Sequence, residues 1–313
     1  WGFWMALNHL KQVVRHAFGR ETELRDEDEL FSYRTAVFGL MVGVTYLIAW
    51  LHAIGFTLPI AVLFLFFLYV FYIGIARVVA EAGLVNLDLP INAHSFTVGM
   101  VGSANMTGST LTGLGLTNAF ARNWRTFTMV GLVHVAWLRE YIWPNRRMLV
   151  LWISMAFIVS VVTSTMYVIY SGYAQGADNL HINLTNTGNL FYNLIVKWMR
   201  NATRITELET IFLTTGAAIN MLLVAGRIFF YWWPLNPIGF VIGAATPITN
   251  FMFTFFLAWL IKLLVMRFGG VSLYRKTQPL FLGILVGYLL GIAVAYVVDS
   301  SWFPDRPHVT EIF

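Results

Sequence analysis

Long apolar segments with at most one charged residue constrain this sequence more than any other feature. Each is about as long as a helix needs to be to cross the ~30 Å hydrocarbon core of a bilayer. Only 11% of the 313 residues are charged and 58% are hydrophobic, and a soluble domain of ordinary composition carries about 25% charged residues. We therefore expect an all-α, polytopic transmembrane helix bundle in contact with the lipid bilayer, with about six to eight membrane segments. The clearest segments are residues 35–54, 58–76, 148–170, 210–230 and 279–298.

Composition and motifs exclude several function classes. The chain has no Cys, so it has no thiolate nucleophile, no Cys-ligated zinc and no disulfide. Its net charge of +5 comes from basic residues scattered at the ends of apolar segments, where they set membrane topology rather than bind nucleic acid. No His-Glu-x-x-His, Gly-x-Ser-x-Gly or Walker motif occurs. We expect no enzymatic activity, no cofactor, no metal site and no nucleic-acid partner.

Charge and polarity divide the chain into five regions. Residues 188–201 repeat apolar side chains on one helical face with Lys197 and Arg200 off that face, which predicts an amphipathic helix at the membrane interface. The five regions are an amphipathic charged segment (1–34), a first membrane helix group (35–170), a polar loop with the interfacial helix (171–206), a second membrane helix group (207–299) and a tail (300–313).

An uncharged polar stretch lies inside the first helix group. Of the 24 residues from Ser95 to Asn118, 15 are Gly, Ser, Thr or Asn. Two interpretations fit this composition equally well. The stretch is either a broken, re-entrant segment that lines a polar cavity, or a helix that packs closely through small residues. The first interpretation makes its polar side chains candidates for a solute pathway, namely Asn105, Thr107, Ser109 and Asn118.

A second interruption follows the span at 210–230. The sequence Trp-Trp-Pro-Leu-Asn-Pro at 232–237 forces a break, and residues 238–266 are too long for one untilted span. We expect either a short half-helix followed by a full span or one kinked helix, and the distribution of basic residues favours a re-entrant half at 238–247. Two interrupted segments, one in each half of a chain, are typical of a transporter binding site. The candidate pathway residues here are Asn220, Asn236, Thr246 and Asn250.

Arg77 and Glu81 stand four residues apart at the end of an apolar segment, on one helical face. Ionisable groups at membrane depth are costly and often functional, so Glu81 is a candidate proton or cation site. The alternative is a juxtamembrane ion pair, with Gly83 ending the helix.

In the last apolar segment, residues 279–298, a glycine recurs at every fourth position. Gly283, Gly287 and Gly291 therefore share one face of the helix, and we expect this face to pack closely against another helix.

Two motifs resemble a known family. Residues 77–84 are similar to its Arg-x-x-Ala-Glu-Ala-Gly-Leu segment, and residues 232–240 to its Trp-Trp-Pro-Leu-His-Pro-x-Gly-Phe, with Asn236 in place of the His. The stretch from Trp259 to Arg275 also resembles it, and the likeness extends from about residue 30 to residue 296. The family comprises large, uncharacterised prokaryotic polytopic membrane proteins that are sometimes labelled oligopeptide-transporter-like.

The resemblance implies a location and a missing portion. Members of the family are about twice this length, and the chain matches their C-terminal half. We expect this chain to be a multi-pass protein of the inner (cytoplasmic) membrane of a prokaryote. Since it begins at Trp1, we expect a missing N-terminal half or a partner chain. Because Asn236 replaces the family's His, a proton role for that side chain does not carry over.

Three functions follow as expectations. The first is a secondary transporter, or the C-terminal half of one, with a cavity lined by residues 95–118 and 236–250 together with Arg77 and Glu81. The second is a non-catalytic scaffold subunit of a larger membrane complex. The third, a haem- or pigment-binding subunit, requires His52 or His134 as an axial ligand, and a lone His in an apolar helix more often bonds a neighbouring helix.

Overall fold

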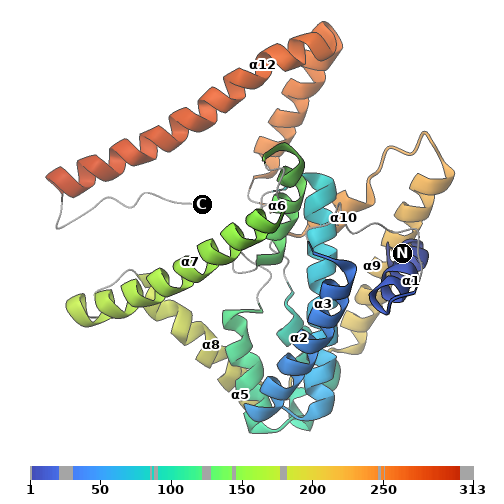
Figure 1. Ribbon diagram of the computed structural model, residues 1–313, viewed down its shortest axis with the longest axis vertical. Coiled ribbons are helices and arrows are strands. Elements are labelled where there is room, and N and C mark those ends of the chain that lie inside the picture. Colours follow the sequence, from blue (N-terminus) through green and yellow to red (C-terminus); the bar gives the residue numbers. More distant parts are fainter. Residues whose placement is uncertain are drawn as a thin grey trace. The chain divides into compact units, whose positions relative to one another are not determined.

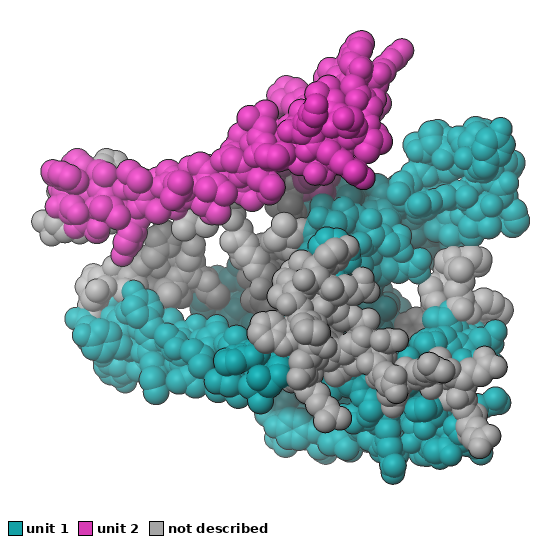
Figure 2. All heavy atoms as spheres, turned by 45° about the horizontal axis from the view of Figure 1, so that its top comes forward, with its two compact units in different colours: residues 1–247 teal, residues 248–313 magenta. Residues whose placement is uncertain are grey.

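The computed structural model describes residues 2–20, 31–84, 87, 91–121, 128–142, 146–176, 182–245, 248–249 and 251–303. The chain divides into two compact units, residues 1–247 and residues 248–313, which Figure 2 shows in different colours. The described residues form eleven α-helices and two short 3-10 helices and contain no strand (Figure 1). The all-α fold class expected from the sequence is confirmed.

Five helices are long and apolar enough to cross a membrane, which is compatible with an integral membrane protein. The last of them, α12, has 51 residues, and Gly270 interrupts it with φ 60° and ψ −163°. Residues 252–269 and 271–302 therefore each reach spanning length at 1.5 Å per residue. The five helices are α2 (Tyr33–Ala53), α3 (Leu58–Ala82), α7 (Arg146–Gln175), α9 (Glu207–Phe229) and α12 (Met252–Trp302).

Helices α2 and α3 form a hairpin whose ends follow from local sequence. The Ser32 hydroxyl accepts a hydrogen bond from the Thr35 N–H and so caps α2. The chain turns at Gly55, where φ is 107°, and a proline occupies the first turn of α3. Helix α3 continues past the expected end at residue 76 and stops at Gly83, whose φ of 67° is left-handed. Arg77 and Glu81 thus belong to its final turns.

The core of unit 1 is built around α3. Phe64 and Leu68 of α3 are buried together with Val98 of α4 (Ala93–Val101), Leu114 of α5 (Gly108–Leu116) and Trp198 of α8 (Ile182–Arg200). Helix α8 is the amphipathic helix expected from residues 188–201, and part of its apolar face packs against α5. The core therefore joins the first helix group to the polar loop region.

Shorter helices complete unit 1. Helix α1 (Gly2–Ala17) contacts α2, and α6 (Thr128–Ile142) contacts α3. Helix α10 (Pro237–Ile242) contacts α9. The two 3-10 helices, η2 (Ser103–Asn105) and η3 (Thr117–Ala119), flank α5.

Unit 2 consists, in its described part, of α12 and the residues that precede it. No residue of α12 is buried. The sequence indicated that the last span begins at Pro279, yet the helix continues through residues 271–278 and across Pro279. Residues 271–278 contain no Gly, Asn or Asp, so nothing there favours a turn, and the break falls at Gly270.

Candidate functional site

A cavity of about 690 Å³ in unit 1 is lined by α3, α9 and α10. Four of the pathway residues predicted from the sequence line it, namely Arg77 and Glu81 from α3, Asn220 from α9, and Asn236 from the start of α10. Residues far apart in the chain therefore meet in one place. This size lies within the range of small-molecule sites, which are mostly apolar with a few convergent polar groups.

On the α3 side, Arg77 and Glu81 form an ion pair. The Arg77 Nε donates to Glu81 Oε1 at 2.7 Å, as the spacing of four residues on one helix face allows. The two side chains remain 50% and 41% exposed, so the pair contributes little stability, at most about 1 kcal/mol. The ion pair and the helix end at Gly83 are both present, and both charged groups line the cavity.

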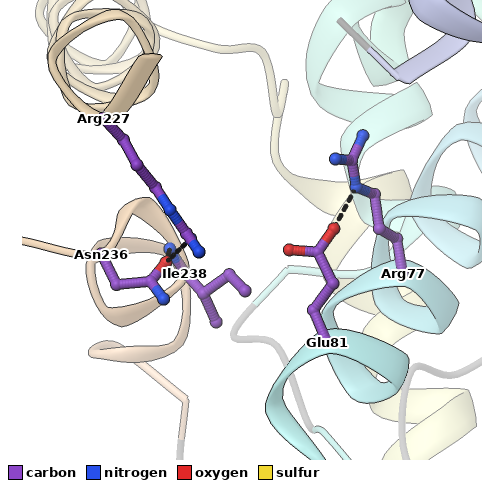
Figure 3. A network of polar contacts seen from close by, with 5 residues as sticks. All are labelled: Arg77, Glu81, Arg227, Asn236 and Ile238. Carbon is purple, nitrogen blue, oxygen red and sulfur yellow. Dashed lines mark hydrogen bonds and ion pairs between the residues drawn. The ribbon is translucent and has the colours of Figure 1, made fainter. Parts of the chain in front are cut away.

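On the opposite side, Asn236 joins α9 to α10. Its Oδ1 accepts a hydrogen bond from Arg227 Nη1 at 3.0 Å and another from the Ile238 N–H at 3.1 Å (Figure 3). The second bond makes Asn236 the N-cap of α10, with Pro237 in the first helical position. One carboxamide oxygen therefore both starts α10 and holds the guanidinium of α9.

A close contact at Gly226 explains how the chain returns to α9 after the Trp-Trp-Pro sequence. A β-carbon at position 226 would lie 2.8 Å from Cε2 of Trp233, so only glycine lets this indole lie against the last turn of α9. The backbone N–H of Trp233 donates to the Phe230 carbonyl at 3.1 Å. Because the chain turns back after α9 ends, Asn236 comes within hydrogen-bonding distance of Arg227 in the last turn of that helix.

Asn220 contributes an unpaired acceptor. Its carboxamide oxygen is buried and has no hydrogen-bond partner among the described residues. A buried oxygen without a donor costs about 1–3 kcal/mol, so a donor from water or from a bound molecule would be favourable here. The residue lies two helical turns before Arg227, with Val224 between them on the same face.

The polar groups extend into the cavity from facing sides. Figure 3 shows the Glu81 carboxylate and the Arg227 guanidinium directed toward the space between α3 and α9. Apart from Arg77, Glu81, Asn220, Arg227 and Asn236, the described residues that line the cavity are apolar. Such an arrangement holds a charged group by ion pairing while the apolar walls contact the rest of the molecule.

Sequence reasoning did not include Arg227 among the site residues. The available signal was an arginine inside an otherwise uncharged span, close to the Trp-Trp-Pro break. Its partner became apparent only when the turn at Trp233 was seen to return Asn236 to α9.

The Ser95–Asn118 stretch is interrupted, as one of the two interpretations required. Helix α4 ends at Gly102, where φ is 90°, and α5 begins after the Thr107 cap. The polar side chains bond to nearby backbone and to each other. Thr107 accepts from the Thr110 N–H at 3.3 Å, Ser109 Oγ donates to the Gly55 carbonyl at 3.1 Å, and Asn105 Nδ2 donates to the Val101 carbonyl at 2.8 Å.

The same stretch also packs closely through small residues. A β-carbon at Gly113 would overlap the ring of buried Phe56, and one at Gly115 would overlap Ile195 of α8. Asn118 is 3% exposed. None of Asn105, Thr107, Ser109 and Asn118 is among the residues that line the cavity. Their role in a solute pathway stays a prediction.

The remaining predicted residues lie elsewhere. Thr246 and Asn250 are outside the described residues. Gly283, Gly287 and Gly291 lie on α12, and a β-carbon at each would meet no atom within 4 Å. Their role in helix packing also stays a prediction. Of the two histidines considered as axial ligands, His52 has its Nδ1 2.9 Å from the Phe56 carbonyl oxygen at the end of α2.

The fold and the cavity together define a class: an all-α protein with several helices of membrane-spanning length and a mostly apolar cavity with a cluster of charged and amide groups. The chain belongs to a family of unknown function (DUF6785), whose model matches residues 1–307. No curated protein and no solved structure matches the chain. The match includes both motifs on which the resemblance was based.

Proposed function

We propose that this chain is a secondary transporter of the oligopeptide-transporter-like kind in the inner membrane of a prokaryote, and not an enzyme. The observation that carries the proposal is the convergence of Arg77, Glu81, Asn220 and Asn236 in one cavity lined by α3, α9 and α10. A missing N-terminal half or a partner chain would complete the pathway.

The position of these groups supports transport. Charged side chains are costly within a membrane protein, and where they persist they commonly face a water-filled route for an ion or solute. The break between α9 and α10 adds a second feature, because transporters place discontinuous helices at their binding sites. A purely structural ion pair would need neither a cavity nor a second guanidinium in the lining of that cavity.

The absence of cysteine from the sequence permits a test that requires no known substrate. Val224 lines the cavity, whereas Leu222 does not and is 70% exposed. Val224→Cys and Leu222→Cys would be reconstituted in liposomes and treated with a membrane-impermeant maleimide. Thiols react as thiolates, which form in water and not in hydrocarbon. A water-filled pathway predicts faster labelling at Val224→Cys, because Leu222 faces lipid.

The opposite order would contradict the proposal. If the cavity is closed to water, or if α9 does not lie in a membrane, exposure alone sets the rates and Leu222→Cys reacts faster. Gly74→Cys and Ile73→Cys provide a matched pair on α3. Gly74 lines the cavity and has open space around its missing β-carbon, and its neighbour Ile73 does not line the cavity.

Glu81 is the proposed coupling group. If it exchanges a proton during transport, an imposed pH gradient will change the side of the membrane from which Val224→Cys is labelled. Glu81→Gln keeps the size of the side chain but removes the titration, so this response should disappear while the protein remains folded. An unchanged response in Glu81→Gln would show that Glu81 does not couple transport to protons.

A scaffold subunit is the second candidate, and α12 is the observation that favours it. None of its residues is buried, and the face with Gly283, Gly287 and Gly291 is open. A scaffold predicts that Gly287→Leu releases a partner chain or a second copy in native gels while cavity labelling is unaffected. Lipid alone on this face predicts no change in assembly size.

A further inference from the structure

Among the described residues that line the cavity, the charges do not balance. Arg77 is paired with Glu81 at 2.7 Å. Arg227 bonds only to a neutral amide, the Asn236 oxygen at 3.0 Å, and has no acidic partner among the described residues. The described lining therefore contains two guanidinium groups and one carboxylate, a surplus of one positive charge.

The position of Arg227 accounts for part of this surplus, but not for the cavity around it. An arginine in the last turn of a helix is stabilised by the helix dipole, typically by about 0.3–1 kcal/mol. That effect requires no facing space. Here the guanidinium lines a cavity of about 690 Å³, and one amide oxygen satisfies only one of its five N–H groups. Arg227 is exposed, so its remaining N–H groups can bond water or an anion that enters the cavity, and the surplus positive charge of the described lining favours the anion.

Apolar walls restrict the kind of anion. Val224 and Ile228 lie beside Arg227 on the cavity face of α9, and Ile238 and Val241 of α10 line the same space. A strongly hydrated inorganic anion would lose its water against these side chains without compensation. An organic anion with an apolar body would place its charge on Arg227 and its body against the walls.

Asn220 marks the far end of the site. Its buried oxygen lacks a donor, and at 1.5 Å per residue it lies about 10 Å along α9 from Arg227. The surface between the two residues is formed by Val224. A molecule that spans this distance would meet a donor at one end, an apolar middle and an acceptor at the other.

We propose that the cavity binds an organic monocarboxylate with an apolar body, whose carboxylate pairs with Arg227 and whose far end donates a hydrogen bond to Asn220. The inference rests on the proposed function, since it names the class of solute that this pathway would take.

The test measures protection of Val224→Cys from maleimide in detergent. Octanoate and 8-hydroxyoctanoate are the probes, and octanol and octylammonium are controls of equal chain length. Both carboxylates should slow labelling, and the controls should not. The hydroxyl should lower the concentration for half protection by about tenfold, since one hydrogen bond to a buried acceptor contributes about 1–1.5 kcal/mol. Protection by octylammonium equal to that by octanoate would overturn the proposal.

Substitutions at Arg227 and Asn220 test which residue binds which end of the carboxylate molecule. Arg227→Gln should raise the half-protection concentration of both carboxylates at least tenfold, whereas Arg227→Lys, which keeps the charge, should restore part of the effect. Leucine is close in shape to asparagine, so Asn220→Leu should remove only the difference in half-protection concentration between 8-hydroxyoctanoate and octanoate. Arg200→Gln on α8 is the control, because Arg200 does not line the cavity. If protection is equal in Val224→Cys alone and in Val224→Cys combined with Arg227→Gln, and both have the same melting temperature, the carboxylate site is wrong.

Two further comparisons separate the outcomes. In proteoliposomes, octanoate added to the water and oleate incorporated in the bilayer distinguish a soluble carboxylate from a membrane fatty acid, and protection by either supports the site. If Val224→Cys is labelled faster than Leu222→Cys but no carboxylate protects it, this inference fails and the transport proposal stands. If Val224→Cys is the slower of the two in the bilayer, the transport proposal itself fails.

Discussion

Replacing Gly113 with alanine tests the close packing of the Ser95–Asn118 stretch. Gly113 is buried in α5, and a β-carbon there would overlap the ring of Phe56, which is 1% exposed. Forcing one carbon into a packed core costs about 1–3 kcal/mol. Alanine also gains about 1 kcal/mol over glycine within a helix. We therefore expect a net loss of about 0–2 kcal/mol in the free energy of unfolding.

Gly131→Ala is the matched control. Gly131 lies within α6, and a β-carbon there would meet no atom within 4 Å, so only the gain in helix propensity applies. The difference between the two variants isolates the packing cost, about 1–3 kcal/mol. Unfolding in mixed micelles with increasing dodecyl sulfate, followed by tryptophan fluorescence, measures both. If Gly113→Ala is stabilised as much as Gly131→Ala, the packing of α5 on Phe56 is wrong.

A double substitution strengthens this test. Phe56→Leu removes part of the ring that the new β-carbon would meet, and alone it should destabilise the protein by leaving a cavity. Combined with Gly113→Ala, the loss should be smaller than the sum of the two single losses, because each substitution relieves the defect of the other. Simple additivity would show that the two sites do not touch.

Three further predictions concern the helix ends and the ion pair. Asn236→Ala should lower the free energy of unfolding by about 1 kcal/mol through loss of the α10 cap, whereas Asn236→Asp, which keeps a cap oxygen, should not. Gly270→Ala should lower it by about 1–3 kcal/mol, because φ of 60° with ψ of −163° strains any residue with a β-carbon; Gly283→Ala, with open space around it, should be neutral or stabilising. Arg77→Gln and Glu81→Gln should each change stability by less than about 1 kcal/mol, since their pair is half exposed. Larger losses in the same micelle assay would contradict the last expectation.

Local patterns predicted most of the helices and part of the site. The apolar runs located α2, α3, α7 and α9 with helix ends at most six residues from those in the structure, because spanning length and apolar composition depend on the segment alone. The spacing of Arg77 and Glu81 likewise predicted their contact, since a helix brings residues i and i+4 together. The Pro-Leu-Asn-Pro sequence predicted the break before α10 for the same local reason.

These local patterns do not predict tertiary contacts. The composition of the Ser95–Asn118 stretch fits both a cavity lining and close helix packing, and the choice depends on which neighbour meets Gly113 and Gly115. The role of Arg227 depends on the turn at Trp233, which the sequence marks only as a break. The continuation of α12 across Pro279 depends on residues 271–278 forming helix in place of the expected turn.

The proposed site requires that α3 and α9 face each other across one cavity, and crosslinking of paired cysteines tests this most directly. Gly74 and Val224 both line the cavity, whereas Leu222 does not and points about 200° away from Val224 around the helix. In membranes, bismaleimidohexane should join Gly74→Cys to Val224→Cys and leave Gly74→Cys with Leu222→Cys unjoined. Equal crosslinking of both pairs, or crosslinking of the Leu222 pair alone, would contradict the arrangement of the site.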